Sequence, residues 1–333
     1  MPDKGIAVTI IIEWENVLLS EFERCRRMLE QLASQTTNII TSQSATGEHT
    51  YAPFEVLIML NPEEVDLVVV EQAVAEYLPR VDGIGSVKIE SAPGQLYYGL
   101  KNVGAERSSG EIIVFLDSDV VPDDNWLDSL LGSMQKKNMA VVGGNAYIEV
   151  NNIVDKAFAV NWFFALRQQQ GGIESVNNFY ANNVAFRRSV FERFKFVVDP
   201  RTARGACVDM ARRLRENGFE IFRDSGAQVS HPPPNGLGHF LVRGIAQGRD
   251  ALMAMRNNIK ARHRANIVHA LIRLLRNTIR AIRKVVARRK VVDIKWFEVP
   301  VVVLISITYQ FLIFIGEFMT FLVPSYMARH FKV

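Results

Sequence analysis

Apolar and amphipathic segments alternate from the start of the chain. Residues 7–12 are β-branched or apolar throughout, which is typical of a parallel strand covered on both faces. Residues 18–33 place apolar side chains among charged ones at helical spacing, so the two segments predict a βα unit. The alternation recurs, with strands expected at 54–60, 87–89 and 111–116 and helices at 63–78 and 96–108.

This alternation predicts an α/β fold, a doubly wound, mostly parallel sheet with helices on both faces. Ligands of such folds bind at the carboxyl ends of the strands, and three polar residues fall at those ends: Glu13, Asn61 and Asp117. Further along, we expect helices at 126–136, 155–169 and 210–217, strands at 140–142 and 183–186, and a loop at 231–238.

Charge sets the C-terminal part apart. Residues 251–292 carry twelve Lys and Arg and no acidic residue, whereas the rest of the chain carries 27 basic and 35 acidic residues. Within 267–289, basic side chains form one helical stripe and apolar side chains another, which predicts a basic amphipathic helix lying on anionic lipid. The alternative is a solvated face of a helix packed on the body of the protein.

Residues 299–323 form a hydrophobic segment in which Glu317 is the one charged residue. The segment is long enough to cross a hydrocarbon core of about 30 Å. Gln310 and Glu317 favour a buried or in-plane helix instead, so both interpretations stay open. Because this segment adjoins the basic helix, we expect membrane lipid and not nucleic acid as the polyanionic partner.

These features divide the chain into a globular domain at 1–250, a basic membrane-surface region at 251–298, the hydrophobic segment at 299–323 and a short tail at 324–333. The positive-inside rule places the membrane-associated body in the cytoplasm, and the residues before the first strand lack the pattern of a signal peptide. Cys25 and Cys207 lie far apart and in no metal-ligand spacing, which fits a reducing compartment.

Asp117 and Asp119 follow a buried strand and are the strongest candidates for chemistry. Two carboxylates at this spacing can share one divalent cation with a diphosphate, because Mg²⁺ and Mn²⁺ prefer oxygen ligands and leave positions for substrate phosphates. The same two residues would also be expected in an ordinary strand-end turn.

The surrounding sequence resembles the family 2 glycosyltransferases. Residues 110–130, GEIIVFLDSDVVPDDNWLDSL, are similar to the stretch of that family in which an apolar strand runs into a DxD and a new helix. Residues 98–105, 182–188 and 209–214 resemble further motifs, so that the similarity covers roughly residues 6–250.

The resemblance implies a GT-A fold, an inverting displacement and a nucleoside-diphosphate sugar as donor, with a UDP-sugar favoured over a GDP-sugar. It further implies a divalent metal, Mn²⁺ or Mg²⁺, held by Asp119 with His231 nearby. The residues expected to bind the nucleotide sugar are Glu13, Glu15, Asn61, Lys101, Asn102, Asp117 and Asn183.

Three departures from the family pattern are evident. Residues 13–16 read Glu-Trp-Glu-Asn where the family has Pro-Thr-Tyr-Asn, and the second strand ends in Asn61 where the family has paired aspartates. Cys207 occupies the position of the usual general base, so Asp209 becomes the candidate catalytic carboxylate, although it is equally placed to stabilise a helix start.

We therefore expect a glycosyltransferase that moves a sugar to a membrane-associated acceptor, either a lipid or a growing glycan, as in polysaccharide biosynthesis. The alternative suggested by the missing base is a catalytically silent glycosyltransferase-like binding protein or scaffold. A nucleotidyltransferase is disfavoured because the sequence has no Gly-rich phosphate loop.

Overall fold

The computed structural model describes residues 6–16, 22–46, 50–78, 81, 83–136, 139–162, 164, 166–167, 171–198, 205–257 and 261–331. The chain divides into two compact units. The first comprises residues 1–147, 167–198 and 206–231, and the second comprises residues 148–166, 199–205 and 232–333. The predicted domain boundary at residue 250 falls inside a helix of the second unit, Gly236–Asn257.

The first unit is built on a sheet with the strand order β3-β2-β1-β4-β8-β6-β9-β5, and β7 pairs with β9. The strands β3, β2, β1 and β4 are parallel, whereas β8 runs antiparallel to β4 and to β6. Both β5 and β7 run antiparallel to β9. The bounds are β1 (Val8–Glu13), β2 (Phe54–Leu60), β3 (Ile84–Ser91), β4 (Ile112–Asp117), β5 (Val121–Pro122), β6 (Val141–Ile148), β7 (Ile173–Val176), β8 (Asn183–Arg187) and β9 (Ile221–His231).

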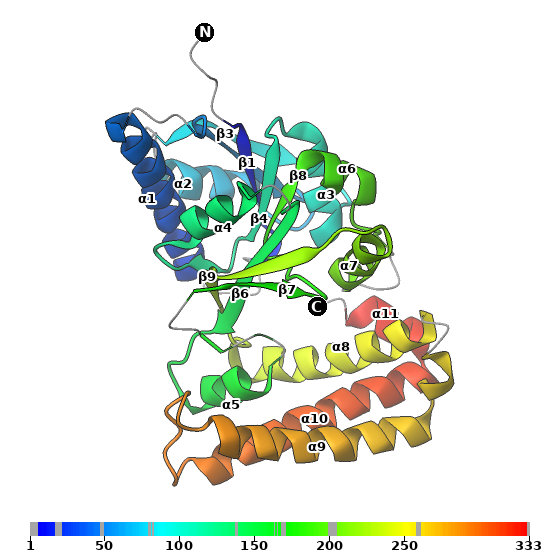
Figure 1. Ribbon diagram of the computed structural model, residues 1–333. Helices are drawn as coiled ribbons and strands as arrows, with labels where there is room; N and C mark the ends of the chain where they lie inside the picture. Colours follow the sequence, from blue (N-terminus) through cyan, green and yellow to red (C-terminus); the bar gives the residue numbers. More distant parts are fainter. Residues whose placement is uncertain are drawn as a thin grey trace. The chain divides into compact units, whose positions relative to one another are not determined.

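Helices cover both faces of this sheet (Figure 1). One face carries α1 (Phe22–Thr46), α2 (Leu67–Tyr77) and α4 (Trp126–Met134), and the other carries α3 (Tyr97–Arg107), α6 (Arg188–Phe194) and α7 (Ala206–Glu216). Every residue of β1, β2 and β4 is buried, as expected for strands sandwiched between helices. The sequence pattern did not predict β9, and α8 starts at Gly236, inside the predicted loop at 231–238.

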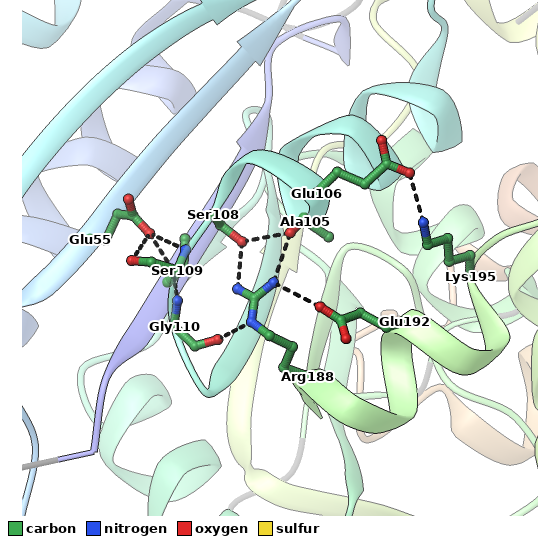
Figure 2. Close-up of polar contacts among 10 residues, drawn as sticks. Glu55, Ala105, Glu106, Ser108, Ser109, Gly110, Arg188, Glu192 and Lys195 are labelled. Carbon is green, nitrogen blue, oxygen red and sulfur yellow. Dashed lines mark hydrogen bonds and ion pairs between the residues drawn. The ribbon is translucent and has the colours of Figure 1, made fainter.

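Arg188 fixes the loop that joins α3 to β4 (Figure 2). Its guanidinium donates to the carbonyl oxygens of Gly110 (2.6 Å) and Ala105 (2.9 Å) and to Oγ of Ser108 (2.8 Å). A Cβ atom on Gly110 would lie 2.4 Å from the backbone nitrogen of Thr9, so only glycine permits this close approach to β1. The loop therefore sets how α3 and β4 lie relative to each other.

The second unit is helical. It contains α5 (Ile153–Asn161), α8 (Gly236–Asn257), a 3₁₀ turn at Arg262–Arg264, α9 (Ile267–Arg288), α10 (Val299–Leu322) and α11 (Pro324–His330). Gly248 and Gly316 let α8 and α10 touch, because a Cβ atom on either would lie 2.0 Å from a carbonyl oxygen of the other helix. Among the described helices, α10 alone is long and apolar enough to cross a membrane.

Candidate active site

A buried polar cluster surrounds Asp117 at the carboxyl end of β4. We call it the Asp117 cluster, and it consists of Glu13, Asn16, Tyr97, Lys101 and Asp117. Lys101 Nζ lies 2.6 Å from Asp117 Oδ1, and both side chains are buried. The Tyr97 hydroxyl donates to Asp117 Oδ2 (2.8 Å), and the Asn16 amide donates to the same oxygen (3.1 Å). Because Tyr97 and Lys101 are four residues apart on α3, both reach one carboxylate.

Glu13 is the second carboxylate of this cluster and pairs with Asp117 in the register of β1 and β4. Its oxygens accept hydrogen bonds from the Asn16 side chain (2.8 Å) and the Glu15 backbone (2.9 Å). Burial and the nearby charge of Asp117 raise the pKa of Glu13 well above its usual range, although Lys101 opposes the shift. Burial and Asp117 also raise the pKa of Tyr97, which remains a phenol donor.

Asp119 lies beside the end of β9. The Arg24 guanidinium joins the two segments, because its Nε donates to the Asp119 carbonyl (2.9 Å) and its Nη2 donates to the Ser230 carbonyl (2.7 Å). β5 and β9 are antiparallel, and Val121 pairs with Ser230. The next residue of β9, His231, therefore lies on the side of this pair toward Asp119. Burial and the charge of Asp119 raise the pKa of the Cys25 thiol to about 12.

Two side chains beside the end of β9 could bind a metal ion: the buried carboxylate of Asp119 and the imidazole of His231. Among the described residues, no group of three or more His, Cys, Asp or Glu is arranged to hold a metal. A carboxylate and an imidazole suit Mn²⁺, and Mg²⁺ also binds through one or two carboxylates plus substrate phosphates. The donor set therefore fits a metal that binds together with a diphosphate.

Four further predicted binding residues make hydrogen bonds within the protein. Asn61 accepts from the backbone nitrogens of Glu63 and Gly94 (both 3.2 Å), and Asn102 exchanges two hydrogen bonds with the Phe196 backbone. Asn183 accepts from Trp126 Nε1 (2.8 Å) and donates to backbone carbonyls of β6 and β9. Glu15 accepts from the Tyr97 backbone (2.6 Å) and so ties residues 13–16 to the start of α3.

Asp209 lies on α7 in contact with arginines of its own helix. Arg212 Nη2 is 2.7 Å from Oδ1, and Arg213 Nε is 2.9 Å from Oδ2. Partial burial disfavours the charged form, but the hydrogen bonds from Arg212 and Arg213 outweigh it and lower the pKa of Asp209. Cys207 accepts a hydrogen bond from the Tyr98 hydroxyl (3.4 Å), and burial raises the pKa of its thiol.

Sequence reasoning missed Tyr97 and Arg24, and it also missed buried polar atoms near the end of β4. Ser118 Oγ, Asn182 Oδ1 and both side-chain polar atoms of Asn145 have no hydrogen-bond partner among the described residues. The helical spacing of Tyr97 to Lys101 was a usable signal, whereas Asn182 and Asn145 come together only through the sheet register.

The register places Asn182 and Asn145 on the sheet face of Asp117. Val184 pairs with Phe115, so Asn182 and Asp117, each two residues further toward the same edge, share a face. Gly144 faces the other way, because a Cβ atom there would lie 2.3 Å from Asn183 Nδ2. Asn145 therefore returns to the Asp117 face.

Comparisons with known proteins agree with this fold. The sequence model of glycosyl transferase family 2 matches residues 21–194. The glucosyl-dolichyl phosphate glucuronosyltransferase of Haloferax volcanii is 26% identical over 149 residues, which is 43% of this chain and 45% of that protein. The pre-mycofactocin glycosyltransferase of Mycobacterium tuberculosis is 27% identical over 155 residues, 45% of this chain and 33% of that protein. The aligned region thus spans less than half the length of these curated relatives.

A solved structure matches almost the whole chain. The mannosyltransferase PcManGT from Pyrobaculum calidifontis, in complex with GDP-Man and Mn²⁺, covers 97% of this chain and 89% of its own, with a TM-score of 0.57 and 14% identity. This likeness confirms the predicted fold class. The chain belongs to glycosyltransferase family 2, whose sequence model covers more than half of it.

Proposed function

We propose that this protein transfers a sugar from a nucleoside diphosphate to a membrane-associated acceptor by a metal-assisted, inverting displacement. The main support is that Asp117, at the end of buried strand β4, and Asp119, two residues later, lie in two different environments. Asp117 is held by Tyr97 and Lys101, and Asp119 lies beside the end of β9 with His231. Family membership supports the same reaction class.

In this proposal the Asp117 cluster shapes the nucleotide end of the donor site. Lys101 pairs with Asp117 in a buried place, and Tyr97 and Asn16 orient the carboxylate by hydrogen bonds. Asp119 and His231 would hold the metal, which when bound neutralises the negative charge of the departing nucleoside diphosphate. The preference for UDP over GDP stays a prediction.

The hydroxyl groups of the donor sugar have candidate partners in Asn145 and Asn182. A buried amide without a partner is costly, and a sugar hydroxyl both donates and accepts hydrogen bonds. Both amides share the sheet face of Asp117, as the strand register requires. We therefore assign them to sugar recognition.

The acceptor is a lipid phosphate. Asp209 is bound by two arginines and its pKa is lowered, and both features make it a weak general base. A phosphate oxygen is already anionic, so it attacks the sugar C1 without losing a proton while the bond from C1 to the diphosphate oxygen breaks and its electrons stay on the leaving group. The relative from Haloferax volcanii, whose name includes dolichyl phosphate, supports a lipid-linked acceptor.

The direct test is a transfer assay with the full chain in detergent, using UDP- and GDP-sugars, Mn²⁺ or Mg²⁺, and a polyprenyl phosphate. We expect metal-dependent release of the nucleoside diphosphate and a sugar-phospholipid product. Donor binding without turnover on any lipid acceptor would favour the silent binding protein instead. Absence of donor binding with and without metal would refute both.

A further inference from the structure

The helix α9 has an exposed apolar face bordered by a basic one. Its buried side is lined by Ala270, Ala281 and Val285. Six apolar side chains are between 43 and 65% exposed and fall on one side of the helix: Val268, Leu271, Ile272, Leu275, Ile279 and Val286. The next sector carries Arg276, Arg280, Arg283 and Lys284. Among the described residues, none buries this apolar face.

The helix α10 runs antiparallel to α9 and packs along it within the second unit (Figure 1). Near the start of α9, Arg273 contacts Glu317 near the end of α10, with Nη2 to Oε2 at 2.6 Å and Nε to Oε1 at 3.1 Å. At the opposite end, the last turn of α9 and the first half of α10 both contact α5. There Arg288 donates to the Val160 carbonyl, and Asn161 donates to Ser306.

Three polar side chains of α10 make contacts inside this unit. Ser306 accepts from Asn161 (2.7 Å), Tyr309 donates to Gln247 (2.9 Å), and Glu317 pairs with Arg273. The exposed side of α10 is instead rich in apolar residues, including Val301, Leu304, Phe311, Phe318 and Phe321. Glu317, whose charge counted against a membrane-spanning helix in the sequence, thus joins α10 to α9 through its ion pair with Arg273.

The antiparallel packing constrains how the pair can meet a bilayer. If α10 crossed the bilayer, α9 would run beside it and carry Arg276, Arg280 and Arg283 to membrane depth, where ionised side chains are costly. If both helices lie in the plane of the leaflet, the apolar face of α9 enters the acyl boundary and its basic face meets anionic headgroups. Only the second arrangement places both the apolar face and the basic face of α9 in surroundings of matching polarity.

We infer that α9 and α10 form an in-plane anchor on an anionic phospholipid leaflet and that α10 does not cross the membrane. The inference rests on the proposed membrane association and adds that residues before and after α10 lie on the same side. The occupant of the exposed face is lipid, because its apolar stripe and the adjoining cations match the acyl boundary and the anionic headgroups of one leaflet.

The test compares two variants that each gain one cysteine, Lys290→Cys before α10 and Arg329→Cys after it, in sealed vesicles from cells that produce the full chain. A membrane-impermeant maleimide is applied before and after detergent lysis, and the unsubstituted protein gives the background from the buried Cys25 and the partly buried Cys207. We expect the two positions to be labelled to the same extent as each other, before as well as after lysis. If one position is labelled before lysis and the other is labelled only after lysis, the in-plane anchor is overturned while membrane association stands. A chain that is not recovered with the vesicles would overturn membrane association and the anchor together.

A second measurement concerns the basic face. The variant with Arg276, Arg280 and Arg283 all changed to Gln should bind phosphatidylglycerol vesicles roughly a hundredfold more weakly than the unchanged chain, because each basic residue near an anionic surface strengthens binding several-fold. The matched control changes Arg107, Arg193 and Arg215, three exposed arginines of the first unit, to Gln and should bind as the unchanged chain does. Equal losses in both variants would overturn the assignment of α9 to the lipid surface.

Discussion

Lys101 and Asp117 form an ion pair of 2.6 Å in which both side chains are buried, and this pair joins α3 to the end of β4. A buried pair adds little net stability compared with an apolar pair of the same shape, but removing one partner leaves an unpaired buried charge. We therefore expect the pair to matter chiefly for the position of the Asp117 carboxyl group.

Replacement of Lys101 by Met should lower the free energy of unfolding by about 3–5 kcal/mol, because the buried carboxyl group of Asp117 would lose its ion-pair partner. Chemical denaturation of the full chain in detergent measures this. Lys195→Met is the matched control, since Lys195 pairs with Glu106 at the surface, and it should cost about 0–1 kcal/mol. A loss below 1 kcal/mol for Lys101→Met would show that Asp117 does not need the cation.

Glu13 should make stability depend on pH. Its pKa is raised in the folded protein, so the folded state holds a proton that the unfolded state has already lost. Glu13 therefore stabilises the folded state most below its ordinary pKa of about 4.5, and this contribution is lost as the pH rises through the raised pKa of the folded protein. Glu13→Gln should therefore flatten the fall in stability with rising pH, whereas Glu63→Gln, at an exposed position, should not. Parallel pH profiles for both variants would argue against a raised pKa at Glu13.

Much of the fold followed from local pattern. Residues 54–60 and 267–289 were predicted almost to the residue, because β2 is an apolar run apart from Glu55 and α9 is a strongly amphipathic helix. The strand β9 was missed because its sequence, IFRDSGAQVSH, is polar and carries glycine, and it depends on pairing with β5 and β7. The extension of α1 to Thr46 was missed because residues 34–46 have no apolar stripe, and Gln35 and Gln43 make tertiary hydrogen bonds instead.

The candidate site was predictable only in part. Asp117 and Glu13 could be placed together because parallel strands end at one edge, and the structure aligns them. The role of Arg24 depends on contacts with residues 95 and 206 positions away, which no local pattern reveals. Asn182 and Asn145 come together through antiparallel strands whose direction the sequence pattern did not indicate.

Replacement of Asn145 by Ala should weaken binding of the nucleotide sugar but not of the free nucleoside diphosphate. Each hydrogen bond lost to a sugar hydroxyl corresponds to about 0.5–1.5 kcal/mol, so affinity should fall roughly two- to twelvefold for each hydrogen bond that the amide makes to the sugar. Calorimetric titration with both ligands separates the two effects. Equal losses for both ligands would place Asn145 outside the sugar site.

Replacement of Asp209 by Asn should reduce transfer to a lipid phosphate by less than tenfold. The carboxylate is held by Arg212 and Arg213, and an anionic acceptor needs no base. A general base would instead contribute about 10²- to 10⁴-fold. A loss of that size with unchanged donor affinity would identify Asp209 as the base and the acceptor as a hydroxyl, contrary to the proposed lipid phosphate.

The proposed function depends most on Asp119 and His231, which we propose hold a divalent metal that binds together with the donor. The measurement is the thermal midpoint of the full chain with UDP- and GDP-sugars, with and without Mn²⁺, since a ligand that binds the folded state raises the midpoint by mass action. We predict that the unchanged chain shows a midpoint increase that requires both donor and Mn²⁺, that Asp119→Asn abolishes it, and that His231→Ala reduces it. A metal-dependent increase that persists in a folded Asp119→Asn variant would contradict the account.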